Sequence, residues 1–108
     1  MGIFEKLRDS IDNNDFDGFA SLLHEDYIFH RHQTGSKMNR SETLEMIKNM
    51  MASDKLEIVD QRCVYENEEI LVHHSVMTFP DDSREAVMAV YIKRDGKLYS
   101  CETGVTKI

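Results

Sequence analysis

Two neighbouring predicted strands, at 55–65 and 69–79, carry polar side chains that could do acid/base chemistry. Successive residues of a strand alternate between its faces, and this alternation places Asp60 on the same face as His73 and Ser75. Most of their neighbours on that face are apolar, and a polar group in an apolar enclosure is costly unless it is paired. The pattern therefore predicts His73 as a proton-transfer residue that Asp60 orients. It also fits a structural histidine with Asp60 at a solvated strand end.

A second group of candidates lies on a shorter predicted strand at 27–32. His30 and His32 share one side of it, and imidazole ligands suit zinc, copper or iron. No third ligand follows at a defining spacing, so we expect neither a metal nor another cofactor. Tyr27 and Arg31 have the opposite parity. Arg31 could bind a carboxylate or enolate oxygen, or it could be a solvated side chain whose stem packs on the protein.

Helices are predicted in the first half of the chain, where apolar residues recur with a helical period. The first helix is expected over 3–13. A second runs from Phe16 to Leu23, after the capping residue Asp15. A third begins at Ser41 as N-cap and ends near Ser53.

The second half changes to the period of two that is typical of strands. Its four runs lie at 55–65, 69–79, 84–94 and 97–107. They predict an antiparallel meander, in which the two-residue turn Asp95-Gly96 sets Arg94 opposite Lys97. The fold class is therefore α+β, with three helices packed on a curved antiparallel sheet that has a short first strand and then a four-strand meander.

If every loop of the meander contains an even number of residues, the alternation along each strand predicts which residues of the four strands share a face. The face of His73 then continues through Ala86, Met88, Val90 and Ile92 to Cys101 and Thr103. Both faces are substantially apolar, whereas a sheet with one wet face should be polar on that side. We therefore expect one face to pack against the helices and the other against a second copy of the chain.

The order of these elements resembles that of the nuclear-transport-factor-2-like superfamily, in its SnoaL-like polyketide cyclase and ketosteroid isomerase-like branches. The resemblance rests on Asp15-Phe16-Asp17-Gly18-Phe19-Ala20-Ser21-Leu22-Leu23-His24-Glu25-Asp26-Tyr27-Ile28-Phe29-His30, on Arg40-Ser41-Glu42-Thr43 and on Asp95-Gly96-Lys97-Leu98. It implies a single domain over 1–108, shaped as a cone around an apolar pocket and commonly dimeric. It also implies that the face of His73 and Thr103 lines that pocket. The ligand contacts expected there are Tyr27, Arg31, His32, Ser75 and Thr103.

At the positions that carry catalysis in these branches, this chain has residues of other types. The resemblance puts Arg31 at the position of the isomerases' general base, and Leu7 and Val90 at the positions that bind the oxyanion. The epoxide hydrolase branch has an acid where this chain has Thr103. These differences leave two functions open. One is a lyase, isomerase or hydrolase centred on His73, and the other is a binding or interaction module without catalysis.

The composition and charge of the chain limit the classes of molecule that it is expected to bind. With 108 residues the chain has room for one core, and 41% hydrophobic with 31% charged residues is typical of globular proteins. A net charge of −7 disfavours nucleic acid, and no apolar run is long enough to cross a membrane. The first residues do not resemble an export signal, so a cytoplasmic location is expected. The predicted partner is a small apolar organic molecule.

Overall fold

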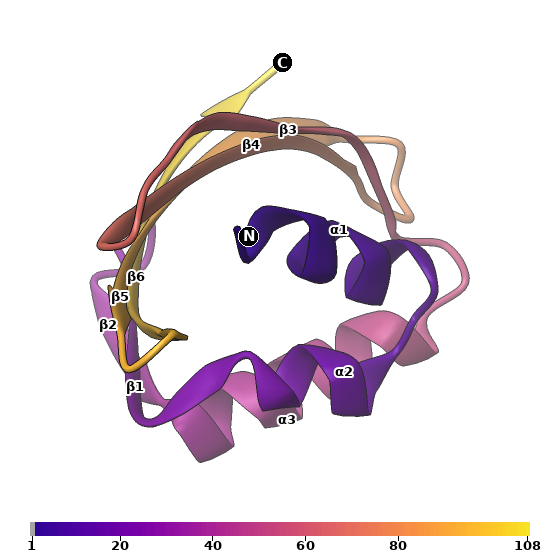
Figure 1. The fold of residues 1–108 in the computed structure, drawn as a ribbon. Coiled ribbons are helices and arrows are strands. Elements are labelled where there is room, and N and C mark those ends of the chain that lie inside the picture. Colours follow the sequence, from indigo (N-terminus) through magenta and orange to yellow (C-terminus); the bar gives the residue numbers. More distant parts are fainter. Residues whose placement is uncertain (1) are drawn as a thin grey trace.

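A computed structural model describes residues 2–108 and shows three helices against one strongly curved sheet (Figure 1). The helices are α1 (Phe4–Asp12), α2 (Phe16–Ser21) and α3 (Arg40–Ala52). The strands are β1 (Leu23–Arg31), β2 (Ser36–Asn39), β3 (Glu57–Glu66), β4 (Ile70–Thr78), β5 (Arg84–Arg94) and β6 (Lys97–Lys107). The α+β class and the four-strand meander are therefore as predicted.

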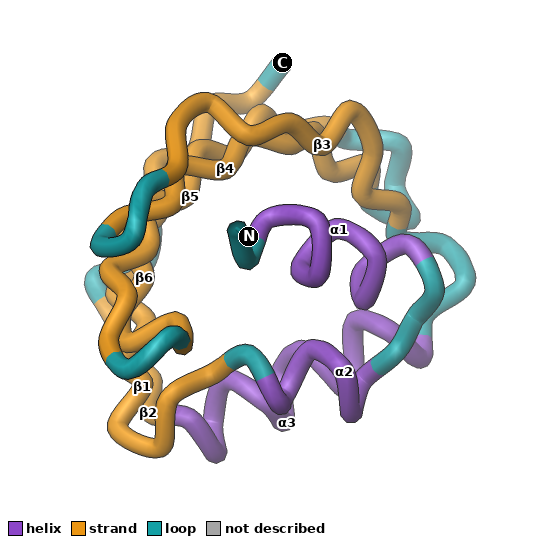
Figure 2. Tube along the Cα trace, in the orientation of Figure 1, coloured by secondary structure: helices purple, strands orange, loops and turns teal. Residues whose placement is uncertain are grey.

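The sheet has the strand order β2-β1-β6-β5-β4-β3. All neighbours are antiparallel except β1 and β6, which run parallel, so the expectation of a wholly antiparallel sheet was wrong at this pair. Strand β2 lies between the predicted strand at 27–32 and the predicted third helix and was not predicted, and its hairpin with β1 forms the edge of the sheet. Figure 2 shows the sheet as an open arc that partly surrounds the helices.

Helix α1 lies inside the arc, between the sheet and the other two helices (Figure 1). Its residue Leu7 is fully buried and belongs to one core with Leu23, Leu71 and Leu98, which are also inaccessible or nearly so. Burying side chains of this size contributes about 1.5–3 kcal/mol each. The predicted apolar stripe of the first helix is thus the contact that holds α1 within the sheet.

The ends of α2 and α3 depend on short polar contacts. Asp15 caps α2 as predicted, because its Oδ1 accepts a hydrogen bond of 3.0 Å from the Gly18 amide. The N-cap of α3 is Asn39 and not Ser41: Asn39 and Glu42 each accept a hydrogen bond from the other's backbone amide, which is a capping box. This pair forms because the chain enters α3 directly from β2.

The register of β5 differs from the prediction because the loop before it contains an odd number of residues. Phe79 and Ser83 close a three-residue loop, whose last residue, Asp82, has the left-handed φ of 69° that such hairpins use. A loop with an odd number of residues exchanges the two faces of β5, so that Val87 and Ala89 face the helices. The residues on the outer face of β5 are Ala86, Met88, Val90 and Ile92. Arg94 does pair with Lys97, as predicted.

A second irregularity restores the predicted face of β6. The pairing of β5 with β6 shifts by one residue between Ile92 and Lys93. Cys101 and Thr103 therefore face the helices, as expected, although their partners across the strand pair are Tyr91 and Ala89. The odd loop before β5 and the register shift near its end were both unpredicted, and each exchanges the two faces of the sheet. Their effects cancel at β6, so its predicted face is correct.

A buried ion pair attaches the start of α1 to the sheet. Glu66 Oε2 accepts hydrogen bonds of 2.6 Å from both Lys93 Nζ and the Ile3 amide. The Lys93 and Glu66 side chains keep only 7% and 15% of their surface exposed. Burial alone would raise the pKa of the Glu66 carboxyl, but the bonds from Lys93 and Ile3 outweigh it and hold that pKa below its usual value.

Candidate functional site

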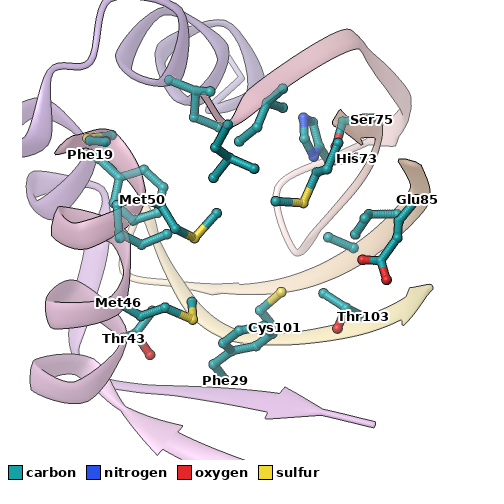
Figure 3. A pocket seen from close by; sticks show the side chains of 18 of the residues that line it. Phe19, Phe29, Thr43, Met46, Met50, His73, Ser75, Glu85, Cys101 and Thr103 are labelled. Atoms are coloured by element: carbon teal, nitrogen blue, oxygen red, sulfur yellow. The ribbon is translucent and has the colours of Figure 1, made fainter. Parts of the chain in front are cut away.

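The inner face of the sheet and the three helices enclose a cavity of about 570 Å³. This volume lies in the range of sites that bind small organic molecules. Most of the wall is apolar and several methionines line it, as Figure 3 shows. Apolar and aromatic wall residues include Phe19, Phe29, Met46, Ile47, Met50, Met51, Met77, Val87, Ala89 and Val105. Such a wall favours a ligand that is itself mostly apolar.

His73 is the most deeply buried titratable side chain that strand β4 contributes to this wall. It keeps 5% of its surface exposed, and its ring lies 5.8 Å from that of Phe4. Burial lowers the pKa of His73 from 6.5 to about 4, and the nearby His74 adds to the effect. The imidazole is therefore neutral near pH 7 and able to accept a proton.

Asp60 is not the partner of His73, which corrects the prediction from strand alternation. Asp60 and Gln61 together lie opposite Ser75 in a β-bulge, where the pairing of β3 with β4 shifts by one residue. Asp60 has a left-handed φ of 53° and an exposed side chain outside the cavity wall. The bulge turns Gln61 inward, and Gln61 Oε1 lies 3.1 Å from His73 Nε2.

Gln61 in turn contacts Asp12, the last residue of α1. Gln61 Nε2 donates a hydrogen bond of 2.8 Å to Asp12 Oδ1, and Asp12 also lines the cavity. The sequence analysis missed both residues, and strict alternation would put Gln61 on the face opposite to that of its neighbour Asp60. A bulge inside a strand leaves no reliable mark in a hydrophobic pattern, so no signal was available for this contact.

Tyr27 and Arg31 of β1 line the cavity, as the resemblance implied. Burial raises the pKa of Tyr27 far above its ordinary value, so its phenol stays protonated. Arg31 Nη1 lies 3.8 Å from Met46 Sδ, and Arg31 forms no salt bridge with any of residues 2–108. The wall therefore contains a cation that is free to meet an oxygen of a ligand.

Ser75 and Thr103 also lie in the wall, and their contact with a ligand stays a prediction. Figure 3 shows Ser75 beside His73, across the cavity from Phe19 and Met50. Cys101 also lines the cavity and is buried on β6, between Phe29 of β1 and Tyr91 of β5. Burial raises the pKa of the Cys101 thiol to about 12, against the opposing effect of hydrogen bonds from Tyr27 and Tyr91. The thiol is therefore protonated and is a poor nucleophile.

His32 does not lie in the cavity, contrary to the sequence analysis. Its Nε2 is 2.9 Å from Glu102 Oε2, and two thirds of its side chain is exposed. The reason is the strand alternation itself, because Tyr27, Phe29 and Arg31 occupy the inward positions of β1.

Across residues 2–108, no three His, Cys, Asp or Glu side chains are grouped in a way that could hold a metal ion. Nor does this part of the chain contain a helix both long and apolar enough to span a bilayer.

Solved structures with the same fold come from several bacteria. A protein described as a candidate ketosteroid isomerase from Kribbella flavida aligns with a TM-score of 0.81 at 17% identity, over 96% of this chain and 75% of its own. A protein of unknown function from Mesorhizobium loti, described as NTF2-like, gives 0.84 at 12% identity, over 96% and 88%. A protein from Sphaerobacter thermophilus gives 0.76 at 13% identity, over 100% and 99%. At these identities the likeness concerns the fold alone.

Sequence comparison is more specific. No curated protein matches this chain. The model of the SnoaL-like domain, however, matches residues 4–101, which include all three helices and most of the sheet. This chain therefore belongs to the SnoaL-like family.

Proposed function

We propose that this protein binds a small, mostly apolar organic molecule in its cavity and that His73 moves a proton on it, as an isomerase, lyase or hydrolase requires. The observation that carries the proposal is a buried, neutral imidazole in the wall of an otherwise apolar cavity. A neutral imidazole accepts a proton at pH 7. A conjugate acid with a low pKa then gives the proton back readily, as a transfer between two atoms of one substrate needs.

Arg31 and Tyr27 are proposed to hold an oxygen of the same molecule. The guanidinium of Arg31 is a hydrogen-bond donor in the wall, and the protonated phenol of Tyr27 becomes one for the ligand when it exchanges its hydrogen bond to Cys101. Removal of a proton from carbon next to a carbonyl leaves negative charge on the oxygen. Donors directed at that oxygen stabilise the charge best in a site that excludes water. The arrangement thus suits proton abstraction beside a carbonyl or a similar acceptor group.

Filling the cavity should prevent binding. Ala89 lies in the wall and is 4% exposed, so Ala89→Phe places a ring in the space a ligand would take. We expect the affinity for 8-anilinonaphthalene-1-sulfonate, an aromatic probe with one anionic group, to fall at least about tenfold in a fluorescence titration. The control is Ala52→Phe at the exposed end of α3. Equal affinities for Ala89→Phe and the wild type would show that the probe binds elsewhere.

Removing the imidazole should abolish proton transfer. A suitable probe is 5-nitrobenzisoxazole, a small aromatic molecule: a base takes its ring C–H proton, the N–O bond breaks, and a coloured cyanophenolate forms. We expect His73→Gln to lower the rate about 10²-fold, at the lower end of general-base effects because the conjugate acid of His73 is strong. The control is His30→Gln on β1, outside the cavity wall. Equal rates for His73→Gln and the wild type, with melting temperatures unchanged, would favour a binding module without catalysis.

We further propose that the outer face of the sheet pairs two copies of the chain. Met88, Val90 and Ile92 form an exposed apolar row on β5, with 40%, 37% and 41% of their surfaces accessible. Gly104 lies opposite Met88 on β6 and presents no side chain, so another backbone can come close there. Burying this row would remove apolar surface from water.

A charge in the middle of that row should separate the copies. The wild type is expected at twice 12.6 kDa in analytical ultracentrifugation, and Val90→Lys at 12.6 kDa. Asn49→Lys, on the exposed surface of α3, adds the same charge away from the row and should stay dimeric. A wild type that sediments as a monomer at high concentration would contradict the proposed interface.

A further inference from the structure

Two hydrogen bonds in sequence connect the end of helix α1 to the imidazole of the cavity. Asp12 Oδ1 accepts from Gln61 Nε2 at 2.8 Å, and Gln61 Oε1 lies 3.1 Å from His73 Nε2. The three residues come from α1, β3 and β4, and Asp12 and His73 both line the cavity. Nothing in the catalytic step proposed above requires Asp12 or Gln61, so their arrangement needs its own explanation.

The chemistry of the three groups allows only one direction for these bonds. An ionised carboxylate can only accept, so the amide of Gln61 must present its NH₂ group to Asp12. Its carbonyl oxygen is then the atom that faces His73, and a carbonyl oxygen can only accept. His73 Nε2 must therefore carry a hydrogen and donate. In a neutral imidazole the other nitrogen, Nδ1, then has a free lone pair.

The local backbone supports a specific role for both partners. The bulge at Asp60 and Gln61, with Asp60 in a left-handed conformation, is what turns Gln61 toward His73. Asp12 ends α1, where a carboxylate meets the negative end of the helix dipole and where the last turn contains no basic residue. Both features are unfavourable for the fold alone, and the hydrogen bonds of Gln61 are the contacts that they make possible.

We infer that Asp12 and Gln61 are positioning residues that hold His73 in its Nε2–H tautomer, so that Nδ1 is the nitrogen that accepts a proton. Among residues 2–108, none forms a hydrogen bond to Nδ1, and the ring stands in the cavity wall. The use of Nδ1 in catalysis rests on the proposed function. The tautomer itself does not, because the hydrogen bonds exist without a ligand.

The tautomer can be measured directly by two-bond ¹H–¹⁵N correlation NMR of the protein labelled at histidine. In the wild type near pH 7 we expect Nε2 of His73 to have a pyrrole-like shift and Nδ1 a pyridine-like shift. Gln61→Leu removes the acceptor, and a measurable population of the Nδ1–H form should appear. Gln61→Lys offers only donors, and the Nδ1–H form should become the major one. In Asp12→Asn, residue 12 no longer fixes the orientation of the Gln61 amide, and we expect a mixture of the two His73 tautomers.

The matched control is Gln33→Leu, which removes a cavity-lining glutamine that contacts Glu85 and not His73. It should leave the shifts of His73 as they are in the wild type. An Nδ1–H tautomer in the wild type, or the same tautomer in Gln61→Leu and Gln61→Lys as in the wild type, would overturn the inference. Neither result would touch the proposed function, which the rates of His73→Gln decide. Conversely, an inactive wild type would leave the tautomer assignment standing.

Discussion

Acidification from pH 7 to pH 4 should destabilise this protein by about 3 kcal/mol through His73 alone. The folded state holds the His73 pKa at about 4, against 6.5 for an unperturbed imidazole, and each pKa unit corresponds to 1.36 kcal/mol. Between these two values the unfolded chain binds a proton at this residue and the folded chain does not. The free energy of unfolding therefore falls as the pH falls from 6.5 to 4. Above pH 6.5, the stabilisation that comes from His73 is fully present.

Urea unfolding at several pH values between 4 and 7 measures this effect. Carboxylates also titrate near the acidic end, so the informative quantity is the difference between the wild type and His73→Gln, in which only position 73 has lost its titratable group. We expect the variant to lose less stability on acidification, by about 3 kcal/mol. Parallel pH dependences would mean that His73 is solvated in the folded protein, and that the proposed proton acceptor is not in an apolar environment.

Truncating Glu66 should cost about 3–5 kcal/mol, because it breaks a buried ion pair and leaves the partner uncompensated. In Glu66→Ala, Lys93 keeps its bond of 2.7 Å to the Asn67 carbonyl, but its charge, 7% exposed, has no carboxylate. The Ile3 amide also loses its acceptor, so the start of α1 keeps only its apolar contacts with the sheet. Chemical denaturation of Glu66→Ala at pH 7 measures the loss.

The matched control for Glu66→Ala is Asp9→Ala. Asp9 pairs with Arg8 at 3.3 Å, but both side chains are largely exposed, at 63% and 40%. Pairs of this kind contribute less than about 1 kcal/mol. A Glu66→Ala variant no less stable than Asp9→Ala would show that Lys93 finds water or another partner when the carboxylate is gone.

The predictable part of the fold is the part that hydrophobic period and turn chemistry determine. The stripe of Leu7 predicted α1, and the Asp95-Gly96 turn predicted the pairing of Arg94 with Lys97. The parallel contact of β1 with β6 joins segments that are far apart in the chain. No local pattern encodes such a contact, because hydrophobic period and turn type describe only residues that are close in the sequence.

The candidate site was predicted less completely for the same reason. His73 and Ser75 follow the alternation of β4 and line the cavity, whereas Thr103 lines it only because the odd loop before β5 and the register shift after Ile92 cancel. Asp60 was assigned as the partner of His73 by extending that alternation through the bulge. One extra residue exchanges the faces of a strand, and Gln61 takes the position that the pattern gave to its neighbour. The choice between the two depends on the backbone and cannot be read from residue types.

The central claim is that the apolar cavity, and not the apolar outer face, is where this protein binds its ligand. Methionine methyl groups test it directly, because Met46, Met50, Met51 and Met77 line the cavity and Met88 lies on the outer face. In methyl NMR of protein labelled with ¹³C-methyl methionine, 8-anilinonaphthalene-1-sulfonate should shift the four cavity signals and leave Met88 unchanged. Shifts at Met88 with unmoved cavity signals would contradict the account.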